Sequence, residues 1–481
     1  MCSKARIAGN LAVTRIRAKL PDMSISESGI KSKIKSGEVN IKVAANHPLI
    51  KLGNVIEWEE LKELVLPDIK ASTKKSKWWL GRKLKLRIHL GAYMLQQLLN
   101  KTDRQIEYDI KDNAAYQIFC GKGIVEDWHC PDHTKIEEFR SRLSCETQRD
   151  LANKISVIAV KLGFARSSEM DIDSTVQKAN IAYPSDVNLM VKLAEKANKV
   201  WKYMKSSISF YADWDIKVDV KNIKSKARRC FFSKIEDKHK VLQELWHSAY
   251  NEVGKVSRAC ECLLSYDIAR MPRNIKRLYS QLEKYGRNYM LDVLSFILHK
   301  KIKADKVLSF HANEVQCFNK GNKRISFGRS IQLGRIKGNF IISCPHDRVR
   351  MEDRHSIELM IRTHEELFGE GILGSVAADK GYYSKANHEV LSSSGIKEIG
   401  LQKPGRNSIP QSPNANEIES KLTNRRAGIE PLIGHMKNKW QLGRSKMKSD
   451  TTTLSAAFAS MLGFNVHQLM RYASGRAKLA T

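Results

Sequence analysis

Three carboxylates occupy positions from which they could act together on one substrate. Asp173 lies in SSEMDIDSTV, whose alternating apolar and acidic residues predict a strand, and Asp379 ends the short apolar strand in GSVAADKGY. Glu430 lies in a late helical segment, RRAGIEPLIGHMK. Side chains at strand ends meet at one edge of an open α/β sheet, where ligands usually bind. The positions therefore predict one site built from these three acids.

Converging carboxylates are the oxygen ligands that hard divalent cations such as Mg²⁺ prefer. Two ions about 3.5–4 Å apart stabilise the attacking and the leaving oxygen of an in-line phosphoryl displacement. Without metal, three close carboxylates would repel a phosphate and one another. We therefore expect two Mg²⁺ ions, replaceable by Mn²⁺, with Asp173, Asp379 and Glu430 as metal ligands and catalytic residues.

The charge of the whole chain predicts a polyanionic partner. Its 83 Lys and Arg residues against 51 Asp and Glu residues give a formal net charge of +32, with a pI near 9.7. No apolar run approaches the ~20 residues of a membrane span, so nucleic acid is favoured over a membrane. The nine cysteines contain no CxxC pair, which is typical of reduced thiols in the cytoplasm. We expect a cytoplasmic, nucleoid-associated protein that binds double-stranded DNA.

Basic residues surround two adjacent tryptophans in TKKSKWWLGRKLKLR. Cations that meet phosphates beside rings that stack or wedge are typical of a nucleic-acid surface. A solvated basic loop with tryptophans in the core is the equally open alternative. The candidate DNA-binding residues of this segment are Lys74, Lys75, Lys77, Arg82 and Lys83.

The first part of the chain predicts a tail followed by helices. Residues 1–45 are basic and polar without a sustained apolar period, so we expect a disordered tail. Residues 46–165 carry apolar stripes at helical spacing, and Thr102 with Gln105 forms a capping-box signature. We interpret this region as an all-α N-terminal DNA-binding domain.

Strands and helices alternate in residues 166–481, which favours an α/β domain with helices on both faces of a sheet. A densely basic helical stretch, about 191–306, interrupts it. Strands with a Gly-containing turn follow in FGRSIQLGRI and GNFIISC, and then a helix that ends at Gly369. We expect a strand at 396–401, a loop at 405–418, and helices at 425–440 and 452–473.

Longer sequence words around the acids give the pattern its specificity. Asp173 opens D-S-T-V-Q-K-A-N-I-A-Y-P-S-D, Asp379 stands in A-D-K-G-Y, and Glu430 in R-R-A-G-I-E-P-L-I-G-H-M-K. Further motifs lie between Ser309 and Gly328, at H-P-L-I-K-L from His47, at F-C-G from Phe119 and at F-R-S-R-L from 139 to 143. With these motifs, the chain resembles the DDE transposases of bacterial insertion sequences, in the group typed on insertion sequence five. The resemblance covers about residues 47–473.

The resemblance implies an RNase H-like catalytic core, a mixed sheet with flanking helices, that carries a large helical insertion and follows the all-α domain. It implies a transposase that binds the terminal inverted repeats of its element, pairs with a second subunit as a homodimer, and catalyses cleavage and strand transfer. The interval between Asp173 and Asp379 is much longer than the ~60–80 residues that such a core needs between them. Stretch 191–306 is therefore the expected insertion.

The resemblance also implies helpers beside the metals. Arg426, Glu430 and Lys437 follow the R-(3)-E-(6)-K signature of the wider transposase group, and helical spacing places them on one face. We expect Arg426, Lys437, Arg425 and Lys380 to contact DNA. Pro431 disfavours helical geometry in the residue before it, so the helix either begins at Pro431 or kinks there.

Three alternatives stay open at this point. Asp171 shares a strand face with Asp173, because residues two apart point the same way, and it is the rival ligand. A catalytically inactive, sequence-specific DNA-binding protein derived from a transposase would keep the same charge. A general nuclease with the same core would cut unrelated DNA equally well.

Overall fold

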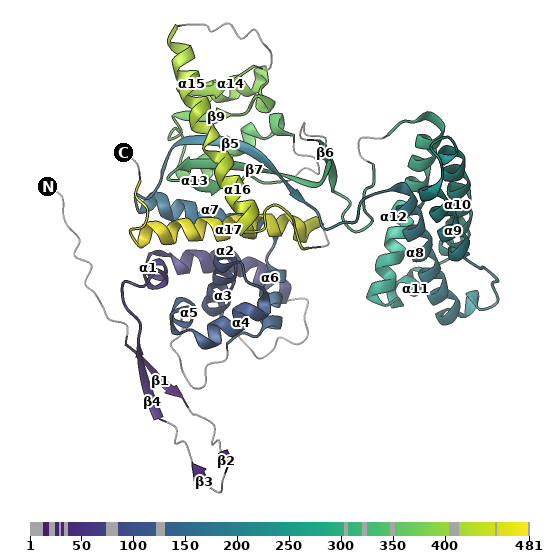
Figure 1. The fold of residues 1–481 in the computed structure, drawn as a ribbon, viewed down its shortest axis with the longest axis horizontal. Coiled ribbons are helices and arrows are strands. Elements are labelled where there is room, and N and C mark those ends of the chain that lie inside the picture. The colour runs from purple at the N-terminus through teal and green to yellow at the C-terminus, as the bar shows by residue number, and fades with distance from the viewer. Residues whose placement is uncertain are drawn as a thin grey trace, which may run out of the picture. The chain divides into compact units, whose positions relative to one another are not determined.

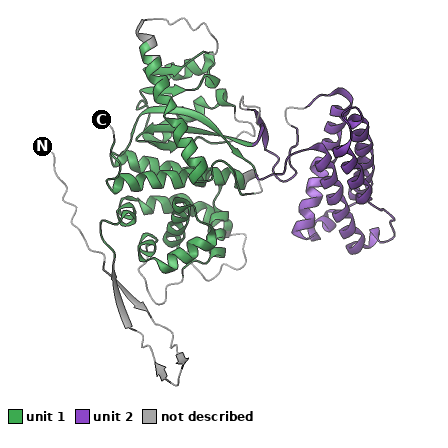
Figure 2. Cartoon of the chain, in the orientation of Figure 1, with its two compact units in different colours: residues 1–179, 328–447, 451–481 green, residues 180–327, 448–450 purple. Residues whose placement is uncertain are grey.

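The computed structural model describes residues 13–18, 25–27, 30–32, 37–73, 85–121, 130–302, 306–319, 325–346, 352–403, 413–447 and 450–479. The chain divides into two compact units (Figure 2). Unit 1 comprises residues 1–179, 328–447 and 451–481, and unit 2 comprises residues 180–327 and 448–450. Figure 1 labels their elements. None of the described helices combines the length and apolarity that a membrane span requires.

This division differs from the domains expected from the sequence. The helices before residue 165 do not form a compact unit of their own, because they share one hydrophobic core with the sheet. Leu151 and Ile155 of the N-terminal region belong to the same core as Ile331 and Leu333 of a central strand. The inserted unit is also wider than the expected 191–306, since it begins at residue 180 and ends at 327.

Short strands lie within the first 45 residues, where the sequence predicted a tail without regular structure. Strand β1 (Val13–Ala18) pairs with β4 (Gly37–Lys42), and β2 (Ile25–Glu27) pairs with β3 (Ile30–Ser32), both antiparallel. The β-branched residues spread through these segments favour extended backbone.

Most of the described residues between 46 and 165 are helical, as predicted. The helices are α1 (Pro48–Val55), α2 (Trp58–Thr73), α3 (Leu86–Leu99), α4 (Asp103–Asp112), α5 (Ala114–Phe119), α6 (His133–Arg142) and α7 (Cys145–Lys161). The predicted capping box is present at the start of α4. The Gln105 backbone N–H donates to Thr102 Oγ1 (3.3 Å), and the Thr102 N–H donates to Gln105 Oε1 (3.0 Å).

A mixed six-stranded sheet forms the centre, in the order β10-β9-β5-β7-β6 with β8 paired to β7. Strand β5 pairs in parallel with β9 and antiparallel with β7, and β10 is parallel to β9. The strands are β5 (Arg166–Lys178), β6 (Gln316–Asn319), β7 (Ile325–Lys337), β8 (Phe340–Ile342), β9 (Ser375–Ala378) and β10 (Glu398–Leu401). A mixed sheet with flanking helices is compatible with the expected RNase H-like core.

The predicted glycine turn connects β7 to β8. Gly338 and Asn339 both have positive φ (104° and 62°), which is the backbone that a two-residue hairpin turn requires. A Cβ at Gly338 would lie 2.6 Å from the Phe164 carbonyl oxygen, so only glycine fits there.

Helices cover both faces of the sheet. On one face, Met170 and Ile172 of β5 pack with α13 (Ile357–Phe368) and α14 (Lys385–Ser393). On the other face, β7 packs with α3, α7, α16 (Ile429–Lys439) and α17 (Asp450–Ala473). Helix α15 (Pro413–Ala427) packs on β9 and β10, and it begins inside the stretch expected to be a loop. Short 3-10 turns are η2 (Asp353–His355) and η3 (Lys380–Tyr382).

Unit 2 is mainly helical, as expected for the inserted block, and β6 and the first residues of β7 also fall within its range. It contains α8 (Asp186–Ser207), η1 (Ser209–Tyr211), α9 (Val220–Phe232), α10 (Lys238–Glu261), α11 (Ser265–Arg270) and α12 (Arg273–His299) around a core of its own. The Tyr289 hydroxyl donates to Asp186 Oδ1 (3.1 Å), and Lys306 Nζ donates to Asp186 Oδ2 (2.6 Å). The half-buried Asp186 therefore links the start of α8 to α12 and to Lys306.

Candidate active site

The strand register places Asp173 and Asp379 beside each other at the carboxyl end of β9. Strands β5 and β9 run in parallel with Ile172 opposite Ala378, and each aspartate is the next residue of its chain segment. Neighbouring strands lie ~4.8 Å apart, so Asp379, just past the end of β9, lies beside Asp173, which is still within β5 and pairs with Leu333 of β7. The prediction that Asp379 directly follows a buried strand is confirmed, because all four residues of β9 are buried.

The guanidinium of Arg426 contacts all three acids. Its Nη1 lies 3.4 Å from Asp173 Oδ2, and its Nη2 lies 3.8 Å from Asp379 Oδ1 and 3.5 Å from Glu430 Oε1. Since all three carboxylates lie within 4 Å of one planar group, the structure brings the predicted acids into one cluster. We call Asp173, Asp379, Glu430 and Arg426 the carboxylate cluster.

A break between two helices positions Arg426 against Glu430. Helix α15 ends at Ala427, and α16 begins at Ile429, so Arg426 lies in the last turn of one helix and Glu430 in the first turn of the next. Neither predicted position for the irregularity is right, because the break lies at Gly428, before Pro431. Pro431 falls in the first turn of α16, where a helix needs no backbone donor.

Gly428 is required at this break by a close approach. A Cβ there would overlap Nη1 of Arg335, which reaches under the turn from β7. The glycine therefore lets α15 and α16 lie close above the strand that carries Arg335.

Asp171, the rival ligand, is held elsewhere. Its Oδ2 accepts hydrogen bonds from Arg335 Nε (2.9 Å) and Nη2 (2.5 Å), and its Oδ1 accepts one from Arg425 Nε (2.8 Å). Its side chain is 4% exposed, against 18% for Asp173. Asp171 and Asp173 are two residues apart on one strand face. Asp171 nevertheless lies in a buried network with two arginines, whereas Asp173 lies beside the other acids.

Arg425, which the sequence predicted as a DNA contact, is part of the same buried network. Besides Asp171, its guanidinium donates to Ser375 Oγ (2.8 Å) and lies 3.6 Å from Glu169 Oε2. Its carbonyl oxygen accepts a bond from Arg335 Nη2 (2.6 Å). The side chain is thereby used to fasten α15 to the sheet. The sequence patterns did not single out Arg335, and only the strand register, which places it opposite Asp171, reveals its role.

A buried tyrosine anchors the turn that carries Asp379. Tyr382 is fully buried, and its hydroxyl donates to Gln332 Oε1 of β7 at 2.5 Å. Burial raises the pKa of this tyrosine well above its usual range, so it remains a neutral donor. The anchor fixes η3 and leaves the preceding residues, Asp379 and Lys380, exposed.

The donor set of the cluster suits a hard cation, but Arg426 now lies among the carboxylates. The Asp379 and Glu430 side chains are 53% and 63% exposed, so the cluster opens to solvent. Over the described ranges, no three His, Cys, Asp or Glu side chains are arranged as a metal site. The carboxylate oxygens are of the chemical type that Mg²⁺ prefers, and in this structure the guanidinium balances their charge.

The other predicted DNA-binding residues are placed as follows. Lys380 is exposed directly after Asp379, and Lys437 is half-buried in α16, two turns beyond Glu430. The basic segment around the adjacent tryptophans, with Lys74, Lys75, Lys77, Arg82 and Lys83, lies outside the described residues.

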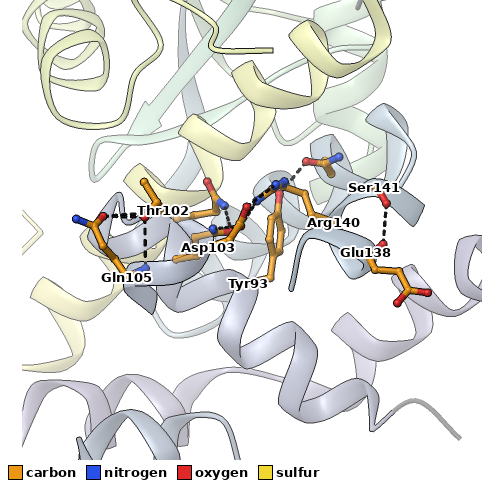
Figure 3. Close-up of polar contacts among 10 residues, drawn as sticks. Tyr93, Thr102, Asp103, Gln105, Glu138, Arg140 and Ser141 are labelled. Carbon is orange, nitrogen blue, oxygen red and sulfur yellow. Dashed lines mark hydrogen bonds and ion pairs between the residues drawn. The ribbon is translucent and has the colours of Figure 1, made fainter. Parts of the chain in front are cut away.

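A polar trough that the sequence did not predict lies at the far end of α16. Its volume is about 580 Å³, and it is lined by α3, α4, α6, α17 and the loop after α16, with Gln97, Asn100, Arg140, Ser141, Gln441 and Arg444 among the lining residues. Figure 3 shows Arg140 turned toward Asp103 in its wall. Arg140 Nη1 and Nη2 donate to the two Asp103 oxygens (2.5 and 3.0 Å), and Gln96 Nε2 also donates to Oδ1 (2.5 Å).

The negative charge of the Asp103 carboxylate is thus balanced by Arg140 within the wall of the trough. Burial would raise its pKa, but the hydrogen bonds from Arg140 and Gln96 outweigh burial and lower the pKa of Asp103. The opposite wall is fixed by Asn100, whose Nδ2 donates to the Lys439 carbonyl oxygen (2.7 Å) and whose Oδ1 accepts from Gln441 Nε2. Asn100 has a positive φ (52°) because it is the left-handed C-cap of α3, and Gln441, just after α16, also has a positive φ (63°).

Comparison with known proteins relates the N-terminal helices to transposition. Residues 38–142 match the family model of a "Transposase domain (DUF772)". The chain is also 25% identical over 109 residues to the "Uncharacterized protein ORF8 in nfe locus" of Rhizobium meliloti; the match covers 22% of this chain and 53% of that protein. The chain thus spans about half the length of this curated relative. No solved structure matches the chain. One wall of the polar trough, from α3 to α6, therefore belongs to a segment that is similar to a transposase domain.

Proposed function

We propose that this chain is a DDE transposase with an RNase H-like catalytic core. The observation that carries the proposal is the carboxylate cluster, in which three acids from distant parts of the sequence meet at one guanidinium. The similarity of residues 38–142 to a transposase domain supports the same interpretation from an independent part of the chain. Its substrates are the double-stranded ends of its own insertion element and a target site.

Asp173, Asp379 and Glu430 would hold two Mg²⁺ ions, with Mn²⁺ as a substitute. When bound, such ions neutralise the charge that develops on the attacking and leaving oxygens of an in-line displacement. Asp173 and Asp379 are fixed by neighbouring strands, and Glu430 is fixed by the first turn of α16, so the ligands are held by regular structure.

The reaction has two phosphoryl transfers at the same site. Water first attacks a phosphodiester at the element end, which forms a new P–O bond and releases a 3′-hydroxyl. That hydroxyl then attacks a phosphodiester of the target, which joins the strands and releases a target 3′-hydroxyl. Positioning and charge neutralisation supply most of the acceleration in such reactions.

The chain's own cations would receive the phosphate. Arg426 balances the carboxylates in the absence of metal, and its fork of donors suits a phosphate once the acids hold cations. Lys380, which is exposed, and Lys437, which is half-buried in α16, would supply further phosphate contacts near the cluster. Synapsis of two element ends would require a homodimer, and the place of action would be the nucleoid in the cytoplasm.

The polar trough would receive the DNA beside the cut. Helix α16 carries Glu430 in its first turn and ends just before the loop that begins at Trp440. At a rise of ~1.5 Å per residue, the stretch from Glu430 to Trp440 places the trough about 15 Å from the cluster. DNA advances ~3.4 Å per base pair, so the trough would contact the duplex about four to five base pairs from the scissile phosphate. Arg444 and Lys446 are exposed at the trough and would meet phosphates.

We expect the double variant R444Q/K446Q to bind DNA about tenfold more weakly. A plot of log affinity against log salt concentration should also have a shallower slope. The slope should change by about 0.9 for each phosphate that the variant no longer neutralises. The control K385Q/K397Q removes the same charge from exposed lysines in and after α14. Fluorescence anisotropy over a salt series measures both. Equal weakening in the two variants would show that only net charge matters.

The function itself is tested by incubating the full chain with DNA that contains the element ends. We expect nicks at the ends that require Mg²⁺ or Mn²⁺ and that EDTA abolishes. A gel shift without any nick would identify a DNA-binding protein that lacks catalysis. Equal cutting of unrelated DNA would instead identify a general nuclease.

A further inference from the structure

Unit 2 exposes apolar side chains at one turn. Among the described residues, the most exposed large apolar side chains are Ile235 (90%) and Phe232 (88%), and Phe231 beside them is 51% exposed. All three lie at the turn from α9 to α10. Phe and Ile are normally buried because their exposure to water costs free energy. Such a group of exposed apolar residues commonly marks an interaction site.

The helical period of α9 accounts for the exposure of Phe232. Ile223, Ala227 and Cys230 are buried, and Ile223 and Ala227 belong to the core of unit 2. Phe232 lies off this buried stripe, whereas Phe231, four residues after Ala227, extends the stripe at the last turn of the helix and is still half exposed. We call Phe231, Phe232 and Ile235 the apolar tip.

The hairpin beneath the apolar tip is held by polar contacts. Lys226 Nζ donates to Ser248 Oγ across α9 and α10, at 2.5 Å, and Lys224 Nζ lies 2.6 Å from Glu195 Oε1 of α8. Trp246 Nε1 of α10 donates to the Met290 carbonyl oxygen (2.7 Å). Exposed side chains on a support of this kind can enter a partner without unfolding their own unit.

Basic residues surround the apolar tip. Exposed cations on both sides of the rings are Arg228, Arg229, Lys234, Lys238 and Lys240. The acids of the same turn are Glu236 and Asp237, and Arg229 lies 3.4 Å from Glu244 Oε2, so the cations outnumber the acids. A basic rim around apolar rings complements a duplex, whose phosphates lie outside its stacked bases.

We propose that the apolar tip of unit 2 is a wedge that enters double-stranded DNA between two base pairs. Apolar side chains that insert at a base step unstack it and kink the duplex, while the surrounding cations hold the phosphates. Flexible pyrimidine–purine steps are the easiest to open. This inference takes its DNA partner from the proposed function and adds a deformation that the carboxylate cluster does not provide.

The test uses the full chain and a short duplex that carries 2-aminopurine at a TA step, because this base fluoresces more strongly when unstacked. We expect the wild type to raise the fluorescence, F232W to keep the rise, and F232A to lose it. Affinity of F232A should fall by about tenfold, as for loss of one stacked aromatic ring. The control L264A removes a side chain of unit 2 that is 69% exposed and should change neither quantity.

Several results would overturn the wedge. An unchanged fluorescence rise in F232A would do so, as would a wild type that binds DNA without any rise. A wild-type dimer that dissociates in F232A with DNA binding intact would assign the tip to a second copy, and loss of binding to anionic vesicles alone would assign it to a membrane surface.

Cleavage assays separate this inference from the proposed function. A chain that unstacks the duplex without nicking it keeps the wedge and loses the transposase, whereas nicking with no unstacking does the reverse.

Discussion

Replacing Asp173 by alanine is expected to reduce metal-dependent nicking by at least about a thousandfold, while the chain stays folded and binds DNA. The variant removes an acid of the carboxylate cluster that we propose as a metal ligand, and loss of about 4 kcal/mol of transition-state stabilisation corresponds to that factor. The fold should tolerate the change, because Asp173 is partly exposed and its ion pair with Arg426 is long, at 3.4 Å. End-labelled DNA and a gel shift measure cleavage and binding separately.

The matched control for this variant is Glu358→Ala. Glu358 is an exposed acid of α13, with 65% of its side chain accessible, and it pairs only locally with Arg362. Its loss changes the net charge by the same amount without touching the cluster, so nicking should be unchanged. Full activity in the Asp173 variant would remove this residue from the catalytic set and refute the proposed site.

Replacing Asp171 by alanine is expected to lower the free energy of unfolding by about 3–5 kcal/mol. The change leaves the buried guanidinium groups of Arg335 and Arg425 without the carboxylate that both of them contact. Breaking a buried pair by removal of one partner is costly, because the remaining charge stays desolvated. Urea unfolding of the variant and the wild type gives the difference.

Asp173→Ala serves as the control for this second prediction. The two aspartates have the same chemistry, strand and face, and they differ in exposure and partners. We expect the Asp171 variant to lose stability and the Asp173 variant to lose nicking. If the Asp171 variant were as stable as the wild type, the arginine network would not be what holds α15 on the sheet.

The sequence alone located the elements that depend on local rules. The capping box at Thr102, the glycine turn at Gly338 and the helix that ends at Gly369, with φ of 104°, were all predicted, because neighbouring residues determine such backbone features. The strand that precedes Asp379 was predicted for the same reason, since four consecutive apolar and small residues favour a buried strand.

The domain boundaries could not be read from composition. The N-terminal helices look independent in the sequence because their apolar stripes are complete helical patterns. A stripe does not say which surface it packs on, and here it packs into the core that β7 and α17 share. Gly428 shows the same limit. A side chain at this position would overlap Arg335, which comes from a strand distant in the sequence.

The sequence by itself determined which acids to examine, and tertiary structure decided which of them meet and which do not. Asp171 and Asp173 are equivalent by periodicity, yet the partners of Asp171 lie 164 and 254 residues further along the chain. Such contacts follow from strand register and helix placement, which no local pattern encodes. The same long-range packing put Arg425 in a buried network and placed Arg426, its neighbour, among the three carboxylates.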